Sequence, residues 1–594
     1  MVGRALALAS ILLFANAAVA QPLVADASMQ RDDAEVRRLL EDGADARLPQ
    51  ADGTTALHWA AYHSDASLAG LLLDAGADPS AATRNGATPM WLAASIGDAA
   101  VIEVLLDAGA DANEVLPLGR RPLMLAARSG RAEAVQVLLS RGADPNARET
   151  ERGTTALMQA ADQGHAEVMR VLIEHGADVA AGSAPVFRDG RTAALGKSGD
   201  PREAVRRQVI AVLCEQDNPD RDALVSLARR GDDAMSATST SELRVEDICA
   251  NQREGIIFTG GGRDRGEREP DGGELTPLVY AARTGSIDAA RVLLEAGADV
   301  NQVTRYGWSP LLAATQNRNY QLGRFLIEHG ADVNLANKGG WTPLYLATDN
   351  RNLEGGDYPT RTPDMDDLEF IKLLLDEGAD PNARMIESTE TRTVFTNQWL
   401  DEEGATAFLR ASQSGDLELM RLLLEYGADP HINTELGVTP LAVAAGIGWV
   451  EGITSEWSPE QTVEAVKFLL ELGIDPNHQA DTGRVALHGA AHKGATEVVR
   501  ILVEAGARLD IRDFGNTDNR GSPELAARTW LPIDYADGLV RVGVQSAIPH
   551  PETAEVLRQL MIEAGLDAPP AGRTLESICI VEVCSADYDP IEYN

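Results

Sequence analysis

The sequence predicts an all-α repeat solenoid, in which stacked helix-turn-helix units are joined by extended, β-hairpin-like fingers. Three observations predict it. Thr276-Pro277-Leu278 opens a short apolar stretch that ends at Gly285, a second apolar stretch ends in Gly297-Ala298-Asp299, and the pattern returns 33 residues later at Ser309-Pro310-Leu311. Because a pair of short helices cannot bury both of its apolar faces alone, this period indicates neighbours stacked in a row.

Each element of the unit has a local physical reason. Thr276 can accept a free backbone N–H as an N-cap, and Pro277 suits the first helical position, where no N–H partner is needed. Gly285 lets the chain turn back, and Ser286 can cap the returning helix. Gly297 supplies the left-handed position that ends the second helix. The unit is therefore helix, turn, helix and finger.

Thr-Pro-Leu, Ala-Ala, glycine, Leu-Leu and Gly-Ala-Asp recur in register along the chain, and this set resembles the ankyrin repeat. In that family, the variable residues after each Ala-Ala pair line a concave groove that grips protein partners. The resemblance therefore implies protein-binding roles for Tyr62, His63, Ser95, Ile96, Arg128, Asp162, Gln163, Arg283, Gln316, Asn317, Asp349, Asn350, Gln413, His492 and Lys493. Their chemical variety suits recognition of an irregular protein surface.

The first 20 residues have the pattern of a signal peptide. Arg4 precedes an apolar run from Ala5 to Ala15, and Ala18-Val19-Ala20 is a small-x-small cleavage signal. No later apolar stretch approaches the ~20 residues that a membrane-spanning helix needs. With five lysines against 47 arginines, the composition suggests a high-GC bacterial genome. We expect a periplasmic or secreted protein that does not insert into a membrane.

The N-terminal repeat block is expected at residues 21–180. Val24 to Leu48 reads as a truncated first repeat whose helix, Ala34 to Asp42, is capped by Asp33. Full repeats then open at Thr55, Thr88, Arg121 and Thr155. Since arginine has no side-chain oxygen, the repeat that opens at Arg121 should lack its N-terminal cap.

The pattern falters at residues 181–273, which are expected to hold degenerate repeats and a flexible charged linker. A second block at residues 274–568 opens repeats at Thr276, Ser309, Thr342, Thr406, Thr439 and Val485, and closes with a divergent repeat near Pro532. Insertions are expected between helices at Asn352 to Asp364, Ile447 to Ser458 and Gly538 to His550, and in fingers at Met385 to Glu403 and Asp513 to Thr529. A tail at residues 569–594 leaves the pattern.

Two insertions contain large aromatic residues among polar residues: Phe395 and Trp399 in a finger, and Trp449 and Trp457 between two helices. Tryptophan is enriched in interface hot spots, which favours a binding role. Aromatic residues also often anchor the loop in which they lie. Both interpretations stay open from the sequence.

All four cysteines lie outside the regular repeats, Cys214 and Cys249 in the interruption and Cys579 and Cys584 in the tail. An even count in an exported protein favours disulfides, and we favour the two local pairings. A redox or metal site at the Cys-x4-Cys of the tail is the alternative, although no Cys-x-x-Cys motif is present.

A net charge of −39 argues against a nucleic-acid partner, because phosphate binding needs clustered lysine and arginine. Part of this acidity belongs to the repeat itself, since one aspartate recurs in each finger. These are Asp45, Asp78, Asp111, Asp144, Asp178, Asp299, Asp332, Asp380, Asp429 and Asp475. The charge is therefore weak evidence for a cationic ligand.

Catalytic and cofactor motifs are not found. His488 and His492 share one helix face, but His488 occupies the position of a structural histidine in the Thr-Pro-Leu-His form of the repeat. Gly196-Lys197-Ser198 has the wrong glycine spacing for a phosphate-binding loop. We therefore predict no metal and no cofactor.

The sequence as a whole predicts an exported, noncatalytic protein that binds or scaffolds another extracytoplasmic protein. A secreted effector or inhibitor that acts on a host or competitor protein is the alternative, and an enzyme with its site in the insertions is the third. The partner and the oligomeric state are not specified by the residues.

Overall fold

The computed structural model describes residues 23–185, 272–352, 361–387, 400, 402–450, 458–515, 529–540, 542 and 548–573. Several predictions lie outside these residues. They are the signal peptide at 1–20, all four cysteines, and Phe395, Trp399 and Trp457.

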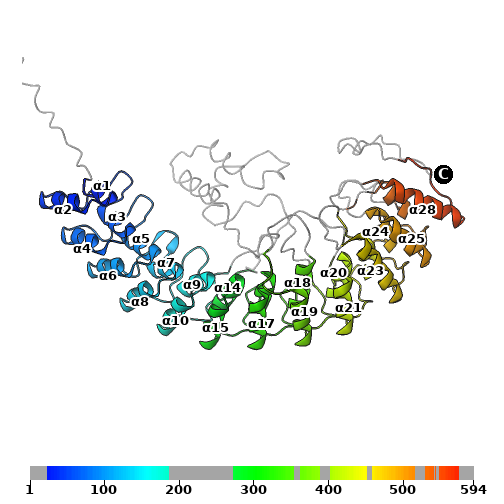
Figure 1. The fold of residues 1–594 in the computed structure, drawn as a ribbon, viewed down its shortest axis with the longest axis horizontal. Helices are drawn as coiled ribbons and strands as arrows, with labels where there is room; N and C mark the ends of the chain where they lie inside the picture. The colour runs from blue at the N-terminus through cyan, green and yellow to red at the C-terminus, as the bar shows by residue number, and fades with distance from the viewer. Residues whose placement is uncertain are drawn as a thin grey trace, which may run out of the picture. The chain divides into compact units, whose positions relative to one another are not determined.

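The described residues form twelve consecutive helix pairs (Figure 1). The first helices of the pairs are α1 (Leu23–Met29), α3 (Ala56–Tyr62), α5 (Pro89–Ile96), α7 (Pro122–Ser129), α9 (Ala156–Gln163), α14 (Pro277–Thr284), α16 (Pro310–Gln316), α18 (Pro343–Arg351), α20 (Ala407–Ser414), α22 (Pro440–Ala445), α24 (Ala486–Lys493) and α27 (Pro532–Ala536). The second helices are α2 (Asp33–Glu41), α4 (Ala66–Asp74), α6 (Ala99–Asp107), α8 (Ala132–Ser140), α10 (Ala166–Glu174), α15 (Ile287–Glu295), α17 (Tyr320–Glu328), α19 (Asp367–Asp376), α21 (Leu417–Glu425), α23 (Pro459–Glu471), α25 (Thr496–Glu504) and α28 (Pro551–Glu563).

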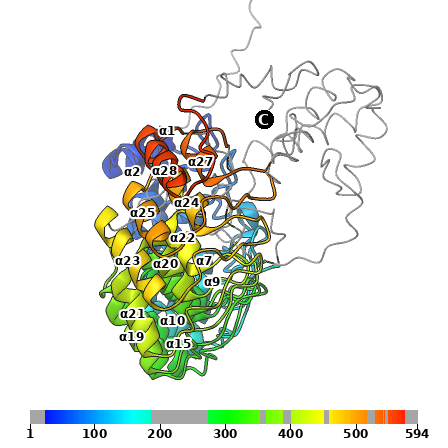
Figure 2. The same ribbon diagram turned by 90° about the vertical axis from the view of Figure 1, so that its right-hand side faces the viewer.

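The helices form two layers. Each first helix packs against the next first helix along the chain, and most second helices pack on the next second helix. Figure 2 shows the two layers, with the fingers on the side of the first helices. The apolar core lies between the layers, where Leu57, Leu72, Leu138 and Leu293 are fully buried. The predicted helical solenoid is confirmed.

The helix caps follow the local chemistry of the sequence. Thr88 accepts the N–H of Trp91 at 3.1 Å, and Thr276 accepts the N–H of Val279 at 3.3 Å. Arg121 provides no side-chain cap for α7, as predicted. At the first pair the prediction is wrong by one residue, because Asp32 and not Asp33 caps α2 through the N–H of Glu35.

The ten finger aspartates have the structural role that their recurrence indicates. The carboxylate of each one accepts the backbone N–H of the residue two positions later, at 2.8–2.9 Å. This bond holds the chain in a turn as it leaves the second helix. Part of the net negative charge is therefore a consequence of the repeat and not of a ligand.

The fingers are turns in the described part of the chain and contain no β-strand there, in contrast to the predicted hairpin-like form. A backbone bond closes each finger at its base, as from the N–H of Thr304 to the oxygen of Trp308 at 3.0 Å. The extended fingers keep this bond, from Met385 to Ala405 and from Asp513 to Trp530. Insertion in a finger therefore leaves the stacking of the helices intact.

The interruption at residues 181–273 also begins and ends in a finger. The N–H of Ser183 donates to the oxygen of Leu275 at 3.0 Å, and the N–H of Glu274 donates back to Ser183 at 3.2 Å. Helix α9 packs directly against α14, and α10 packs against α15. The two predicted repeat blocks thus belong to one unit of stacked helices.

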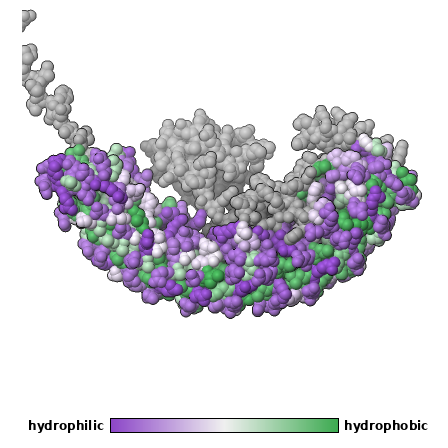
Figure 3. Space-filling view, viewed as in Figure 1, coloured by the Kyte–Doolittle hydropathy of each residue, from purple (hydrophilic) through white to green (hydrophobic). Residues whose placement is uncertain are grey.

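The N-terminal end of the row has a mainly hydrophilic surface over α2 (Figure 3). A polar outer face is what a solenoid needs at its end. Within the described ranges, no helix is long and apolar enough to cross a membrane.

Candidate protein-binding surface

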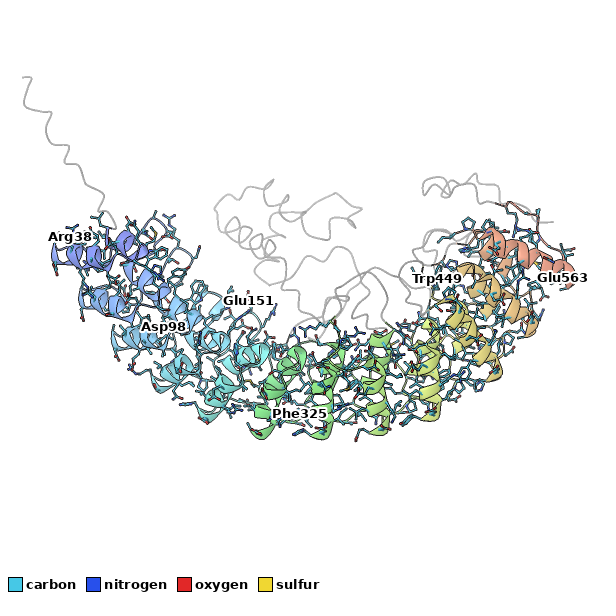
Figure 4. The ribbon with its side chains drawn as sticks, viewed as in Figure 1. Arg38, Asp98, Glu151, Phe325, Trp449 and Glu563 are labelled. Atoms are coloured by element: carbon cyan, nitrogen blue, oxygen red, sulfur yellow. The ribbon has the colours of Figure 1, made fainter. Side chains whose placement is uncertain are left out.

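The binding residues predicted after each Ala-Ala pair lie at the C-terminal ends of the first helices, where the chain turns toward each second helix. We call the exposed face of α1, α3, α5, α7, α9 and α14 the N-terminal first-helix surface. Tyr62, Arg128 and Gln163 are exposed on it, and His63 and Arg283 are partly exposed. Figure 4 shows Glu151 on the finger side of the molecule and Phe325 on the opposite, second-helix side.

An aromatic cluster forms the beginning of this surface. The ring of Trp59 lies 5.8 Å from that of Tyr62 and 5.9 Å from that of His63, measured between centroids. The indole N–H of Trp59 donates to Gln50 at 2.9 Å, and the side-chain amide of Gln50 donates to Asp26 at 2.7 Å. These bonds fix Trp59, while Tyr62 remains 55% exposed. The cluster is therefore an ordered aromatic platform.

Further apolar side chains are exposed on the helices that pack against α3 and in the finger before α7. Leu23 and Met29 belong to α1, which packs on α3, and Ile96 belongs to α5, which packs on the other side of α3. Leu118 is 48% exposed in the finger before α7, within the short 3-10 helix Pro117–Gly119. Exposed apolar side chains that gather on neighbouring elements indicate an interaction surface.

The α14 end of the surface is polar. Tyr280 of α14 lies beneath Arg283, whose guanidinium carbon is 5.6 Å from the centre of the tyrosine ring. Burial raises the pKa of the Tyr280 hydroxyl, so it stays a neutral donor and acceptor at ordinary pH. The polar groups here can hydrogen-bond a partner, while the aromatic platform can bury apolar area.

The equivalent positions in the second half of the row are occupied by internal contacts. Asp349 was predicted to bind a partner, but its carboxylate accepts the Nε–H of Arg410 at 2.9 Å. Arg410 is buried and also donates to Ser414 and to the backbone oxygen of Asn352. Gln316 is only partly exposed. Asp349 and Arg410 thus connect α18 to α20 rather than present a free surface.

Three predicted binding residues are buried, which corrects the prediction for them. Asn350 is 0% exposed, Gln413 is 5% exposed and His492 is 1% exposed. The ring of His492 lies 6.2 Å from that of Trp449 and 6.3 Å from that of Tyr535, measured between centroids. Tyr535 belongs to the divergent last pair, which packs against α24, and the repeat pattern gave no indication of this contact. Trp449 is partly exposed after α22 (Figure 4).

His58 and His488 have the structural role that the repeat pattern implies. The Nδ1 of His488 accepts the N–H of Val485 at 3.1 Å, and its Nε2 lies 3.2 Å from the oxygen of Trp530. Complete burial lowers the pKa of His488 to about 4, so the ring is neutral at pH 7. Within the described residues, no group of three potential metal ligands exists.

Sequence reasoning missed Trp59, Leu118 and Tyr280 as members of the surface. Trp59 and Tyr280 lie three residues before the predicted positions Tyr62 and Arg283, so one helical turn separates them. The helical period was the signal that could have identified them.

Comparison with known proteins agrees with this geometry. A sequence model described as three copies of the ankyrin repeat matches residues 24–116, 65–149, 92–183, 255–337, 278–385 and 408–513. Since these ranges cover more than half of the 594 residues, the chain belongs to the ankyrin-repeat family. Ankyrin repeats mediate protein–protein interaction and are typically noncatalytic. No curated protein matches the chain.

Proposed function

We propose that this chain is an exported, noncatalytic protein that binds another extracytoplasmic protein through the N-terminal first-helix surface. One observation carries the choice of surface. Tyr62 and Arg128 are exposed, whereas Gln413 and His492, which follow the same helix position in later repeats, are buried. Among the described residues, this position is therefore exposed at the beginning of the row and buried in α20 and α24.

The surface has the composition of an interface. Its aromatic platform offers area that loses water on binding, and tyrosine and tryptophan dominate hot spots for that reason. Polar and charged side chains such as Gln163 and Arg283 surround it. Export is supported by the signal-peptide pattern of residues 1–20.

A site-specific photo-crosslinker tests the surface. Placed at Tyr62 in the full chain, within its own cells, it should give a discrete adduct with one partner protein. The same group at Glu174, exposed on α10 in the second-helix layer, is the control and should give none. Adducts at Glu174 alone would show that the partner binds elsewhere.

Intact-mass analysis of the same purified chain tests export. We expect a mature protein that begins at Gln21. A mass that retains Met1 to Ala20 would overturn the proposed localisation.

A further inference from the structure

The charges of the molecule are distributed unequally between the two helix layers. The six first helices from α3 to α16 contain three charged residues, Arg128, Asp162 and Arg283. The six second helices from α4 to α17 contain nine carboxylates and three arginines. In a chain of net charge −39, the part of the N-terminal first-helix surface from α7 to α14 therefore carries two arginines against one aspartate, while Asp26 adds a carboxylate at α1.

Among the described residues, the guanidinium groups of the two arginines of this surface form no ion pair or hydrogen bond. Arg128 is exposed, and its guanidinium makes no ion pair or hydrogen bond with any of the described residues. The guanidinium of Arg283 contacts the Tyr280 ring there, while its backbone oxygen accepts hydrogen bonds from Asn319 and Arg361. An arginine without a protein partner remains free to bind a carboxylate through two parallel hydrogen bonds.

Two neighbouring carboxylates are engaged. Asp162, on the helix between the two arginines, accepts the side-chain amide of Gln163 at 3.1 Å. Glu149 is buried and accepts the backbone N–H groups of Glu151, Arg152 and Thr154 at 2.6–3.0 Å. These bonds lie within the finger and its adjoining helix, so neither carboxylate neutralises Arg128 or Arg283 directly.

The stacking of the helices sets the spacing of the arginines. Helix α7 packs on α9 and α9 packs on α14, and packed helices lie about 8–10 Å apart. Arg128 and Arg283 are thus roughly 20 Å apart along the row, a distance that about six residues of extended chain cover. The aromatic platform lies two further helices away, at α3, so the whole surface suits roughly a dozen extended residues.

We propose that the N-terminal first-helix surface binds an extended acidic peptide segment of a partner protein. Two carboxylates about six residues apart contact Arg128 and Arg283, and an aromatic or aliphatic side chain near one end packs on Trp59, Tyr62 and Ile96. This inference rests on the proposed function and specifies the chemistry of the partner. A basic segment would face like charge here, and repulsion from the distant carboxylates is screened beyond about 8 Å at physiological salt.

A displayed library of random twelve-residue peptides tests this chemistry. Selection against the full chain should enrich peptides with two acidic residues about six positions apart and one large apolar residue. A synthetic peptide of that class should bind about tenfold more weakly to an Arg128→Gln, Arg283→Gln double variant, because both carboxylates lose their bidentate partners. Replacing its two acidic residues by amides should weaken binding to the wild type equally.

The matched control removes two arginines from the second-helix layer, Arg170→Gln and Arg324→Gln, and should leave the affinity unchanged. Thermal unfolding of every variant is measured to confirm an intact fold. Enrichment of basic peptides, or equal binding of acidic peptides to the Arg128 and Arg283 variant, would overturn the inference. If the selected peptides of either charge crosslink to a photo-crosslinker placed at Tyr62, the proposed function stands. Peptides that crosslink only to one placed at Glu174 would contradict both the proposed function and this inference.

Discussion

Asn334 connects two neighbouring repeats through both ends of its side-chain amide. Its Nδ2 donates to the backbone oxygen of Gly378 at 2.9 Å, and its Oδ1 accepts the N–H of Asp380 at 2.7 Å. Asn113, Asn146 and Asn301 each form the same two hydrogen bonds to the next repeat. Each asparagine thus provides hydrogen-bond partners for two backbone groups that lie just after the following second helix.

Replacing Asn334 by alanine should therefore destabilise the protein by about 1–3 kcal/mol, because two backbone groups lose their partner. Urea unfolding monitored by circular dichroism measures the change. Asn85 is exposed in an earlier finger, and Asn85→Ala should stay within about 0.5 kcal/mol of the wild type. Equal effects of the two substitutions would contradict a connecting role for Asn334.

The buried pair between Arg410 and Asp349 should contribute far more than an exposed pair. Arg410→Ala leaves the Asp349 carboxylate and the oxygen of Asn352 without their donor, so we expect a loss of about 3–5 kcal/mol. Arg170→Ala breaks an exposed pair with Glu167 and should cost less than about 1 kcal/mol. Chemical unfolding of both variants gives the comparison, and a loss below 1 kcal/mol for Arg410→Ala would refute it.

His488 should make stability depend on pH on the acidic side. Its pKa of about 4 in the folded chain lies below the ordinary value of 6.5, so the unfolded chain binds the proton more readily between these values. The contribution of His488 to the free energy of unfolding is fully present above pH 6.5. It decreases as the pH falls toward 4, by roughly 3 kcal/mol in total. The measurement is the free energy of unfolding from pH 7.5 to 4.

The control for this pH effect is a comparison of two variants. His488→Gln should lower stability at pH 7 and flatten the decrease between pH 6.5 and 4, since no imidazole then titrates at the site. His431 is exposed, and His431→Gln should keep the wild-type slope. An unchanged slope in His488→Gln would show that other groups cause the pH dependence.

Two helical glycines should respond to alanine in opposite directions. A Cβ at Gly489 would lie 2.5 Å from the backbone nitrogen of Ile447 and 2.8 Å from the carbonyl carbon of Gly446. Because backbone must move, we expect Gly489→Ala to destabilise by about 1–3 kcal/mol. Nothing lies within 4 Å of a Cβ at Gly70, so Gly70→Ala should stabilise by about 0.5–1 kcal/mol. Midpoints of thermal unfolding give both signs, and stabilisation by Gly489→Ala would contradict the close approach.

Much of the fold could be predicted because its determinants are local. Thr276 and Gly285 act within one helix, and a missing side-chain oxygen at Arg121 removes a cap regardless of the surroundings. The choice between Asp32 and Asp33 failed because adjacent aspartates offer the same chemistry, and only the turn of the chain decides between them.

The binding surface was less predictable, because exposure is a property of neighbours. Equivalent helix positions hold Tyr62 and His492, and the sequence treats them alike. Tyr62 remains exposed near the beginning of the row, while Trp449 and Tyr535 pack beside His492.

The sequence by itself determined the repeat, its period, its caps and the structural role of its aspartates, since each depends on residues within one unit or its direct neighbour. Only the tertiary structure decided that α9, which ends at Gln163, packs against α14, which begins at Pro277, and that the guanidinium groups of Arg128 and Arg283 remain unpaired within the described part of the chain. Both depend on contacts between residues far apart in the sequence, and a periodic pattern contains no information about those contacts.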